Sequence, residues 1–241
     1  MNEEILLLKK EKVYKPEDTN NINMPPGDLK RSPDESFFLN FHETLIFIDE
    51  AFLSKLSKHF GSGKYLKFDR IKFSKNLAEK EKLICRQIFL YISPPFQSPI
   101  PLKEEEIRKE GYDKFINNLK KEEIIIREGR CQRLKIDGKF TYNQKAVDVL
   151  LAMDLTSVPL KYPKIKRIIL ISSDNDFVPV IKNLKEQDVK TILYTYYERK
   201  RDSPFSRSNE LIKSVFKYVL LNKKDLESCL FDKSKRDEKN G

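Results

Sequence analysis

The fold is decided by residues 168–180, which read IILISSDNDFVPV. A continuous apolar run ends at two serines, Asp174 and Asp176 follow, and the apolar residues then take helical spacing. An apolar run of this kind is typical of a strand buried on both faces of a parallel sheet. The stretch therefore predicts a buried strand that leads into a helix, with two carboxylates at the junction. In open α/β sheets, ligands bind at this carboxyl edge.

The same pattern recurs along the chain. Further apolar runs indicate strands at residues 43–49, 83–92, 123–127 and 189–194. Helical spacing or amphipathic patterning indicates helices at residues 50–56, 103–121, 144–157 and 175–187, with one or two more within 209–230. Alternating strands and helices predict a three-layer α/β/α sandwich with a mostly parallel central sheet. Between these elements, the dipeptide Asp137-Gly138 predicts the turn of a β-ribbon over residues 129–142.

Three segments are expected. Residues 1–40 form an N-terminal extension, whose polar composition and four prolines between residues 16 and 33 predict partial disorder. Residues 41–222 form the α/β domain. Residues 223–241 form a C-terminal helix and a charged tail.

Composition favours a polyanionic partner. The chain of 241 residues carries 47 Lys and Arg against 37 Asp and Glu, a formal net charge of +10. A basic balance points to nucleic acid before an anionic membrane surface, although a lysine-rich chain can also be basic for solubility alone. Only seven glycines are present, and neither glycine-rich phosphate-binding motif occurs.

The cysteines and termini predict a cytoplasmic protein. Three widely spaced cysteines and two histidines form neither a zinc pattern nor a disulfide framework. No signal peptide opens the chain, and no stretch approaches the roughly 20 apolar residues of a membrane span. We therefore expect no membrane contact and leave a homodimer open.

Three acidic segments are expected to converge on the carboxyl edge of the sheet. Asp49 ends the strand 43–49, Asp174 and Asp176 follow the strand 168–171, and Asp148 lies in the helix 144–157. Like charges brought together raise one another's pKa, and a divalent cation relieves this. Oxygen ligands without His or Cys suit Mg²⁺ or Mn²⁺. Such metals activate water and stabilise the charge of a phosphodiester under attack.

Simpler roles stay open for each acid. Asp49 or Asp174 could cap a helix, and Asp148 could be a solvated helix position. Asp154 is six residues beyond Asp148, about 240° around the helix, and therefore ranks lower. Lys145, on the same expected helix face as Asp148, could orient a phosphate or form a salt bridge.

The nucleic acid is expected on a basic, aromatic loop after the strand 189–194. Aromatic and basic side chains together suit a single-stranded backbone and its bases. The candidate substrate-binding residues are Lys145, Tyr196, Arg199, Lys200, Arg201 and Arg207.

Three blocks, residues 47–49 (FID), 145–154 (KAVDVLLAMD) and 171–179 (ISSDNDFVP), resemble the NYN domain in order and spacing. The similarity is to its LabA-like (DUF88-type) branch of the PIN-like nucleases and covers roughly residues 44–220. It implies a PIN-like, Rossmann-like fold and metal-dependent cleavage of RNA, and it leaves open whether the cleavage is endo- or exonucleolytic. It also implies that Asp49, Asp148 and Asp174 are the metal ligands, with Asp176 as a supporting catalytic group and Asp154 as a weaker candidate.

The chain departs from the family pattern in four places, one of them in the late helix, where Ser214-Val215 stands near the position of the usual Ala-Asp pair. Phe52 stands where the family has asparagine, and Ala146 and Ser173 stand where it has glycine. The resemblance therefore supports two functions, a metal-dependent ribonuclease and a catalytically weak NYN regulator that binds RNA or protein. A response-regulator phosphoacceptor domain is a third reading, but the chain offers no convincing acceptor and lysine set for it.

Overall fold

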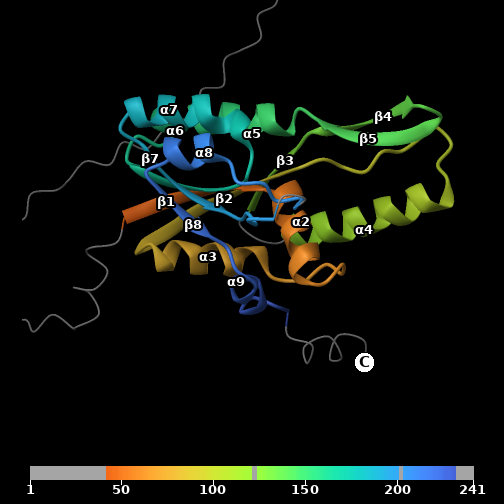
Figure 1. Cartoon of the computed structure of the whole chain (residues 1–241), viewed down its shortest axis with the longest axis horizontal. Coiled ribbons are helices and arrows are strands. Elements are labelled where there is room, and N and C mark those ends of the chain that lie inside the picture. The colour runs from red at the N-terminus through yellow and green to blue at the C-terminus, as the bar shows by residue number, and fades with distance from the viewer. Residues whose placement is uncertain (1–41, 121–123, 201–202, 232–241) are drawn as a thin grey trace, which may run out of the picture. The chain divides into compact units, whose positions relative to one another are not determined.

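The computed structural model describes residues 42–120, 124–200 and 203–231, and its centre is one six-stranded sheet (Figure 1). The strand order is β3-β2-β1-β6-β7-β8, and every neighbouring pair is parallel. The sheet is therefore wholly parallel, where a mostly parallel sheet was predicted. The strands are β1 (His42–Asp49), β2 (Leu83–Ile92), β3 (Ile124–Glu128), β6 (Arg167–Ile171), β7 (Lys190–Thr195) and β8 (Lys217–Leu220).

Helices cover both faces of the sheet, which confirms the three-layer prediction (Figure 1). Alternate residues of β1 serve the two cores, since Ile46 and Ile48 face one helical layer and Leu45 and Phe47 the other. The first layer comprises α2 (Glu50–Phe60), α3 (Arg70–Lys80), α4 (Lys103–Lys120) and α9 (Lys223–Glu227). The second comprises α5 (Val147–Thr156), α6 (Val158–Lys161), the 3-10 helix η1 (Asn175–Phe177), α7 (Val178–Glu186) and α8 (Asn209–Ser214).

The strand order contains a reversal that positions the site. The chain moves outward from β1 through β2 to β3, then returns to the other side of β1 and moves outward through β6, β7 and β8. This is the doubly wound Rossmann-like order, and its switch point lies between β1 and β6. The carboxyl ends of these two strands carry Asp49 and the segment Ser172–Asp176.

The predicted ribbon is present and longer than expected. β4 (Arg130–Ile136) pairs with β5 (Lys139–Lys145) in an antiparallel ladder. Asp137 and Gly138 have φ values of 50° and 77°, the two positive values that a type I′ hairpin turn requires. Because the ladder continues to the pair Arg130–Lys145, the prediction that a helix begins at Gln144 is wrong. Lys145 lies on the ribbon, and α5 begins at Val147.

The C-terminal region contains a strand where only helices were expected. β8 lies between α8 and α9 and forms the edge of the sheet beside β7. Its residues, among them Tyr218 and Val219, favour strands, but the strand is short and mostly exposed, so it carries no alternating pattern.

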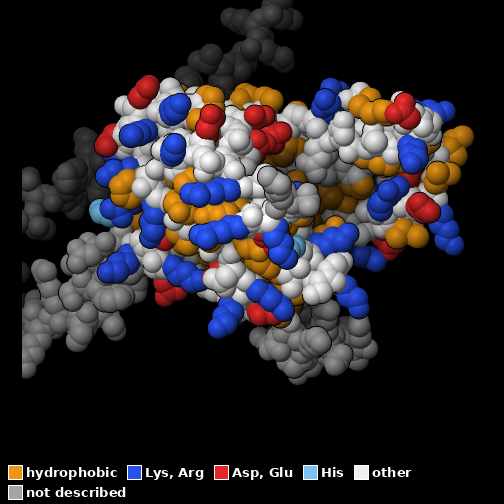
Figure 2. Space-filling view, viewed as in Figure 1, with side chains coloured by type: hydrophobic (Ala, Val, Ile, Leu, Met, Phe, Trp, Pro, Cys, Tyr) orange, Lys and Arg blue, Asp and Glu red, His pale blue; other side chains and the backbone are white. Residues whose placement is uncertain are grey.

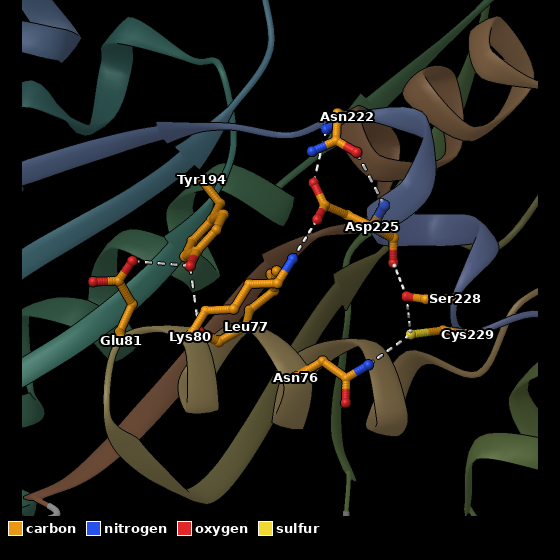
Figure 3. A network of polar contacts seen from close by, with 9 residues as sticks. All are labelled: Asn76, Leu77, Lys80, Glu81, Tyr194, Asn222, Asp225, Ser228 and Cys229. Carbon is orange, nitrogen blue, oxygen red and sulfur yellow. Dashed lines mark hydrogen bonds and ion pairs between the residues drawn. The ribbon is translucent and has the colours of Figure 1, made fainter.

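The helix α9 is joined to α3 by a network of polar contacts (Figure 3). Lys80 pairs with Asp225, which also completes a capping box with Asn222. Asn76 donates to the Sγ atom of Cys229. The side chains of Leu226 and Cys229 are fully buried in the core beside these contacts.

Some predicted features lie outside the described residues, namely the N-terminal extension 1–40 and most of the charged tail. All three cysteines are free thiols. Within the described segments, no helix is both long enough and apolar enough to cross a bilayer.

Candidate active site at the carboxyl edge of the sheet

Asp49 is the buried member of the acidic group. It ends β1 and caps α2, since its Oδ1 atom accepts from the backbone N–H of Phe52 at 3.1 Å. Its Oδ2 atom accepts from the hydroxyl of Ser172 at 3.1 Å. The pKa of Asp49 is raised to about 6, mainly by burial; the two hydrogen bonds oppose this rise, and the charges of Asp148 and Asp174 contribute to it. Asp49 is thus both a helix cap and a member of the acidic group.

Asp148 lies in the first turn of α5 and is exposed. The chain reaches it directly from the ribbon, through Ala146 at φ 67°. Partial burial of the carboxyl group raises the pKa of Asp148, and the charges of Asp174 and Asp176 add to the effect.

Asp174 and Asp176 follow β6 through a short, hydrogen-bonded turn. Asp174 caps η1 by accepting from the backbone N–H of Asp176 at 2.9 Å, and its own N–H donates to the Ser172 hydroxyl at 3.2 Å. Asp174 is half-buried and Asp176 is exposed. The charge of Asp174 acts on the buried Asp49, whereas Asp176 lies on the solvent side.

These four carboxylates form one electrostatic group. The charges of Asp148 and Asp174 raise the pKa of Asp49, and the charges of Asp174 and Asp176 raise the pKa of Asp148. The group lies at the switch point, where α/β folds bind ligands. Figure 2 shows acidic side chains gathered where α5 meets the ribbon, on a face otherwise rich in Lys and Arg.

The donor chemistry of the group suits Mg²⁺ or Mn²⁺, because every candidate ligand is a carboxylate oxygen. A cation would also offset the repulsion that raises the pKa of Asp49 and Asp148. Within the described residues, no three His, Cys, Asp or Glu side chains already have the spacing of a metal site. The chemistry and the charge fit a divalent cation, whereas the side chains are not arranged as a closed ligand shell.

Asp154 has structural partners instead. Its Oδ2 atom accepts from the hydroxyl of Tyr91 at 2.9 Å and lies 2.8 Å from Nε of Arg127. Tyr91 is fully buried beside Asp49 in the sheet register. Asp154 thereby joins α5 to β2 and β3.

Glu50, the residue after Asp49, is also engaged elsewhere. It is buried and pairs with Arg70 at 2.6 Å.

The structure shows the surroundings of three residues that depart from the family pattern, Phe52, Ala146 and Ser173. Phe52 is 5% exposed and its ring lies in the core on the α2 side, so this position offers no polar group to the site. Ala146 has a left-handed backbone, the conformation that glycine adopts without penalty. Ser173 lines a small hollow together with Thr195, Tyr197, Ser206 and Ser208.

Sequence reasoning missed Ser172, which contacts both Asp49 and Asp174. Its position in the sequence could have indicated this, because Ser172 directly follows the strand and stands two residues before Asp174.

The predicted substrate loop is partly packed. Tyr196 is half-buried between Phe60 and Phe205, and its hydroxyl donates to Glu198 at 3.2 Å. Arg199, Lys200 and Arg207 are exposed, and Arg207 lies over the ring of Tyr197. Arg201 lies outside the described residues. The cations rather than the tyrosine are therefore the part of this loop that is open to a ligand.

Comparison with known proteins identifies the family. The family model of the NYN domain matches residues 43–220. No curated protein matches the chain. A crystal structure of a protein of unknown function from Vibrio parahaemolyticus is similar at 14% identity and a TM-score of 0.48, covering 79% of this chain and 97% of that one. The chain belongs to the NYN family, a branch of the PIN-like nuclease superfamily.

Proposed function

We propose that this protein is a metal-dependent ribonuclease that hydrolyses RNA phosphodiester bonds at the carboxyl edge of its sheet. The observation that carries the proposal is the coupling of buried Asp49 to Asp148 and Asp174 at the switch point. Separate elements, β1, α5 and the β6–η1 turn, supply these three acids. Helix capping alone would not require carboxylates from three separate elements to lie close enough to interact electrostatically.

In this proposal, Asp49, Asp148 and Asp174 hold Mg²⁺ or Mn²⁺, which would activate water and stabilise the charge that develops on the phosphate. Ser172 orients Asp49, and Asp176 supports the exposed side of the site. Lys145 and the loop cations Arg199, Lys200, Arg201 and Arg207 bind the RNA backbone, with Tyr196 holding the loop. We place the reaction in the cytoplasm, in line with the free thiols.

A second function is favoured by one observation, the apolar side chain of Phe52. Without an amide at this position, the protein would bind RNA or a protein partner as a regulator and cleave poorly.

The test is cleavage of labelled RNA in Mn²⁺, in EDTA, and by the Asp174→Asn variant. Asparagine still caps η1, so folding is retained while a ligand charge is lost. We expect the single-turnover rate to fall by about 100-fold or more in EDTA and in the variant. Asp188→Asn, a change of the same kind in an exposed residue after α7, is the matched control and should leave the rate unchanged. Equal cleavage in all samples would refute the nuclease, and RNA binding without cleavage would support the regulator.

A further inference from the structure

The β4–β5 ribbon has two unequal faces. Directly opposed residues of an antiparallel pair share a face, and the faces alternate along the strands. One face contains the pairs Arg133–Tyr142 and Lys135–Phe140. The other contains Arg130–Lys145, Gln132–Asn143, Leu134–Thr141 and Ile136–Lys139.

The first face is held against the loop before α4 and the start of that helix. Arg133 lies over the ring of Phe96 at 4.6 Å and near Glu105 at 3.6 Å. Tyr142 packs against Phe96, with a distance of 6.0 Å between ring centroids, and lies beneath Arg108. These contacts fix the ribbon as it projects beyond the sheet beside α4 (Figure 1).

The second face is cationic and open. It carries Arg130, Lys139 and Lys145, all exposed, with the amides of Gln132 and Asn143 between them. No acidic residue lies on this face, and among the described residues the ribbon's single ion pair is that of Arg133 on the other face. Three cations without counter-charges match a polyanion and do not match an apolar protein surface.

The topology places the base of the ribbon, with the pair Arg130–Lys145, beside the acidic group. The ribbon follows β3, at one side of the carboxyl edge, and leads through Ala146 to Asp148. The loop with Arg199 and Lys200 leaves the same edge after β7, on the other side of β1 and β6. Four strand spacings, about 19 Å, separate β3 from β7. The acids thus lie between two cationic segments, within the span of a few nucleotides.

We propose that the face of the ribbon formed by Arg130, Gln132, Lys139, Asn143 and Lys145 binds the phosphate backbone of the RNA on one side of the bond to be cleaved. This inference rests on the proposed function for the identity of the polyanion. The contacts are to phosphates, so they position the RNA without selecting its sequence.

The test is the salt dependence of RNA binding by the full chain in EDTA, where cleavage does not interfere. The probe is a fluorescently labelled single-stranded RNA of about 20 nucleotides, longer than typical single-strand site sizes. The ribbon variant is Arg130→Gln/Lys139→Gln/Lys145→Gln. The matched control, Lys161→Gln/Lys164→Gln/Lys185→Gln, removes the same charge from exposed residues around the amino end of β6 and the last turn of α7.

Each phosphate contact on a single strand contributes about 0.7 to the slope of log affinity against log salt. The ribbon variant should therefore bind about 100-fold more weakly at 0.1 M salt, with a slope smaller by about 2. The control should change affinity by no more than about 3-fold, since its charges lie outside the contact. Arg130→Lys, which keeps the charge, should retain the wild-type slope, and unfolding midpoints should show that every variant is folded.

The outcomes separate this inference from the proposed function. Equal salt slopes for the ribbon and control variants, with wild-type binding intact, would overturn the role of the ribbon and leave the nuclease standing. A selective loss in the ribbon variant would support the ribbon even if Mn²⁺ produced no cleavage, in which case the nuclease alone falls. Failure of the wild type to bind RNA would overturn both.

Discussion

The hydroxyl of Ser172 donates to the Oδ2 atom of Asp49 at 3.1 Å and so joins the ends of the neighbouring strands β6 and β1. The same hydroxyl accepts from the N–H of Asp174. One side chain thereby connects the buried Asp49 to the turn that carries the half-buried Asp174 and the exposed Asp176. The strand order thus brings the acids to one edge of the sheet, and the hydrogen bonds of Ser172 join two of them.

Replacing Ser172 by alanine should raise the pKa of Asp49 further, because the hydrogen bond stabilises the carboxylate. The acidic limb of the pH profile for RNA cleavage should move to higher pH by up to about one unit. Stability should fall by about 1 kcal/mol. The neighbouring substitution Ser173→Ala is the control for both measurements, and an unshifted profile in Ser172→Ala would contradict the orienting role.

The ionisation of Asp49 should make the metal-free protein less stable as pH rises. Its folded-state pKa of about 6 lies above the ordinary 3.8, so folding favours the neutral acid; the stability it contributes is fully present below about pH 4 and is lost as the pH rises to about 6. A shift of about two units corresponds to about 3 kcal/mol in total, of which about 2 kcal/mol is lost between pH 4 and pH 7. Urea unfolding in EDTA should show that Asp49→Asn removes this dependence. A pH-independent difference between wild type and variant would be inconsistent with the buried acid.

Glycine at position 146 should stabilise the protein. Ala146 has φ 67°, and a residue with a Cβ atom pays about 1 kcal/mol or more in this region. We expect Ala146→Gly to raise the free energy of unfolding by about 0.5–1 kcal/mol, whereas Ala152→Gly, inside α5, should lower it by about 1 kcal/mol. Thermal or urea unfolding measures both, and destabilisation of both variants would argue against the left-handed junction.

Asparagine at position 154 should affect stability more than catalysis. Asp154 holds Tyr91 and Arg127, and its side chain is 12% exposed. Asp154→Asn should lower the free energy of unfolding by about 1–3 kcal/mol. The cleavage rate of the folded fraction should fall by less than about tenfold, in contrast to Asp174→Asn. A loss of rate equal to that of Asp174→Asn would instead place Asp154 in the metal site.

Restoring the family asparagine at position 52 should not restore a catalytic contact. Phe52 is a core residue, and its backbone rather than its side chain bonds to Asp49. We expect Phe52→Asn to cost about 3–5 kcal/mol through a cavity and a buried amide, without faster cleavage. Phe52→Leu, which stays apolar, should cost less. A gain of activity in a folded Phe52→Asn variant would show that the asparagine reaches the site.

The features predicted correctly from sequence are those encoded by local pattern. The buried runs around Phe47 and Leu170 give the strands, and alternation with helices gives the layers. The turn at Asp137-Gly138 is encoded by the dipeptide itself. Asp49, Asp174 and Asp176 follow because parallel strands end at a common edge, whereas Asp148 comes from a helix; the role of all four in a metal site stays a prediction.

The features that were missed depend on contacts between distant segments. β8 is a strand because Lys217 pairs with Ile192, and Lys145 is on the ribbon because it pairs with Arg130. Tyr196 is half-buried because α2 supplies Phe60. A local pattern of apolar residues does not indicate which distant segment a residue will contact.

The packing of α9 shows that the segment that must fold is longer than the segment that carries the motifs. The family match ends at residue 220, yet Leu226 and Cys229 complete the core beneath the sheet, and Asp225 fastens them to α3. A recombinant fragment that ends at residue 220 would keep all the acidic residues of the site but would expose the apolar core that Leu226 and Cys229 cover. A shortened chain should therefore keep Leu226 and Cys229.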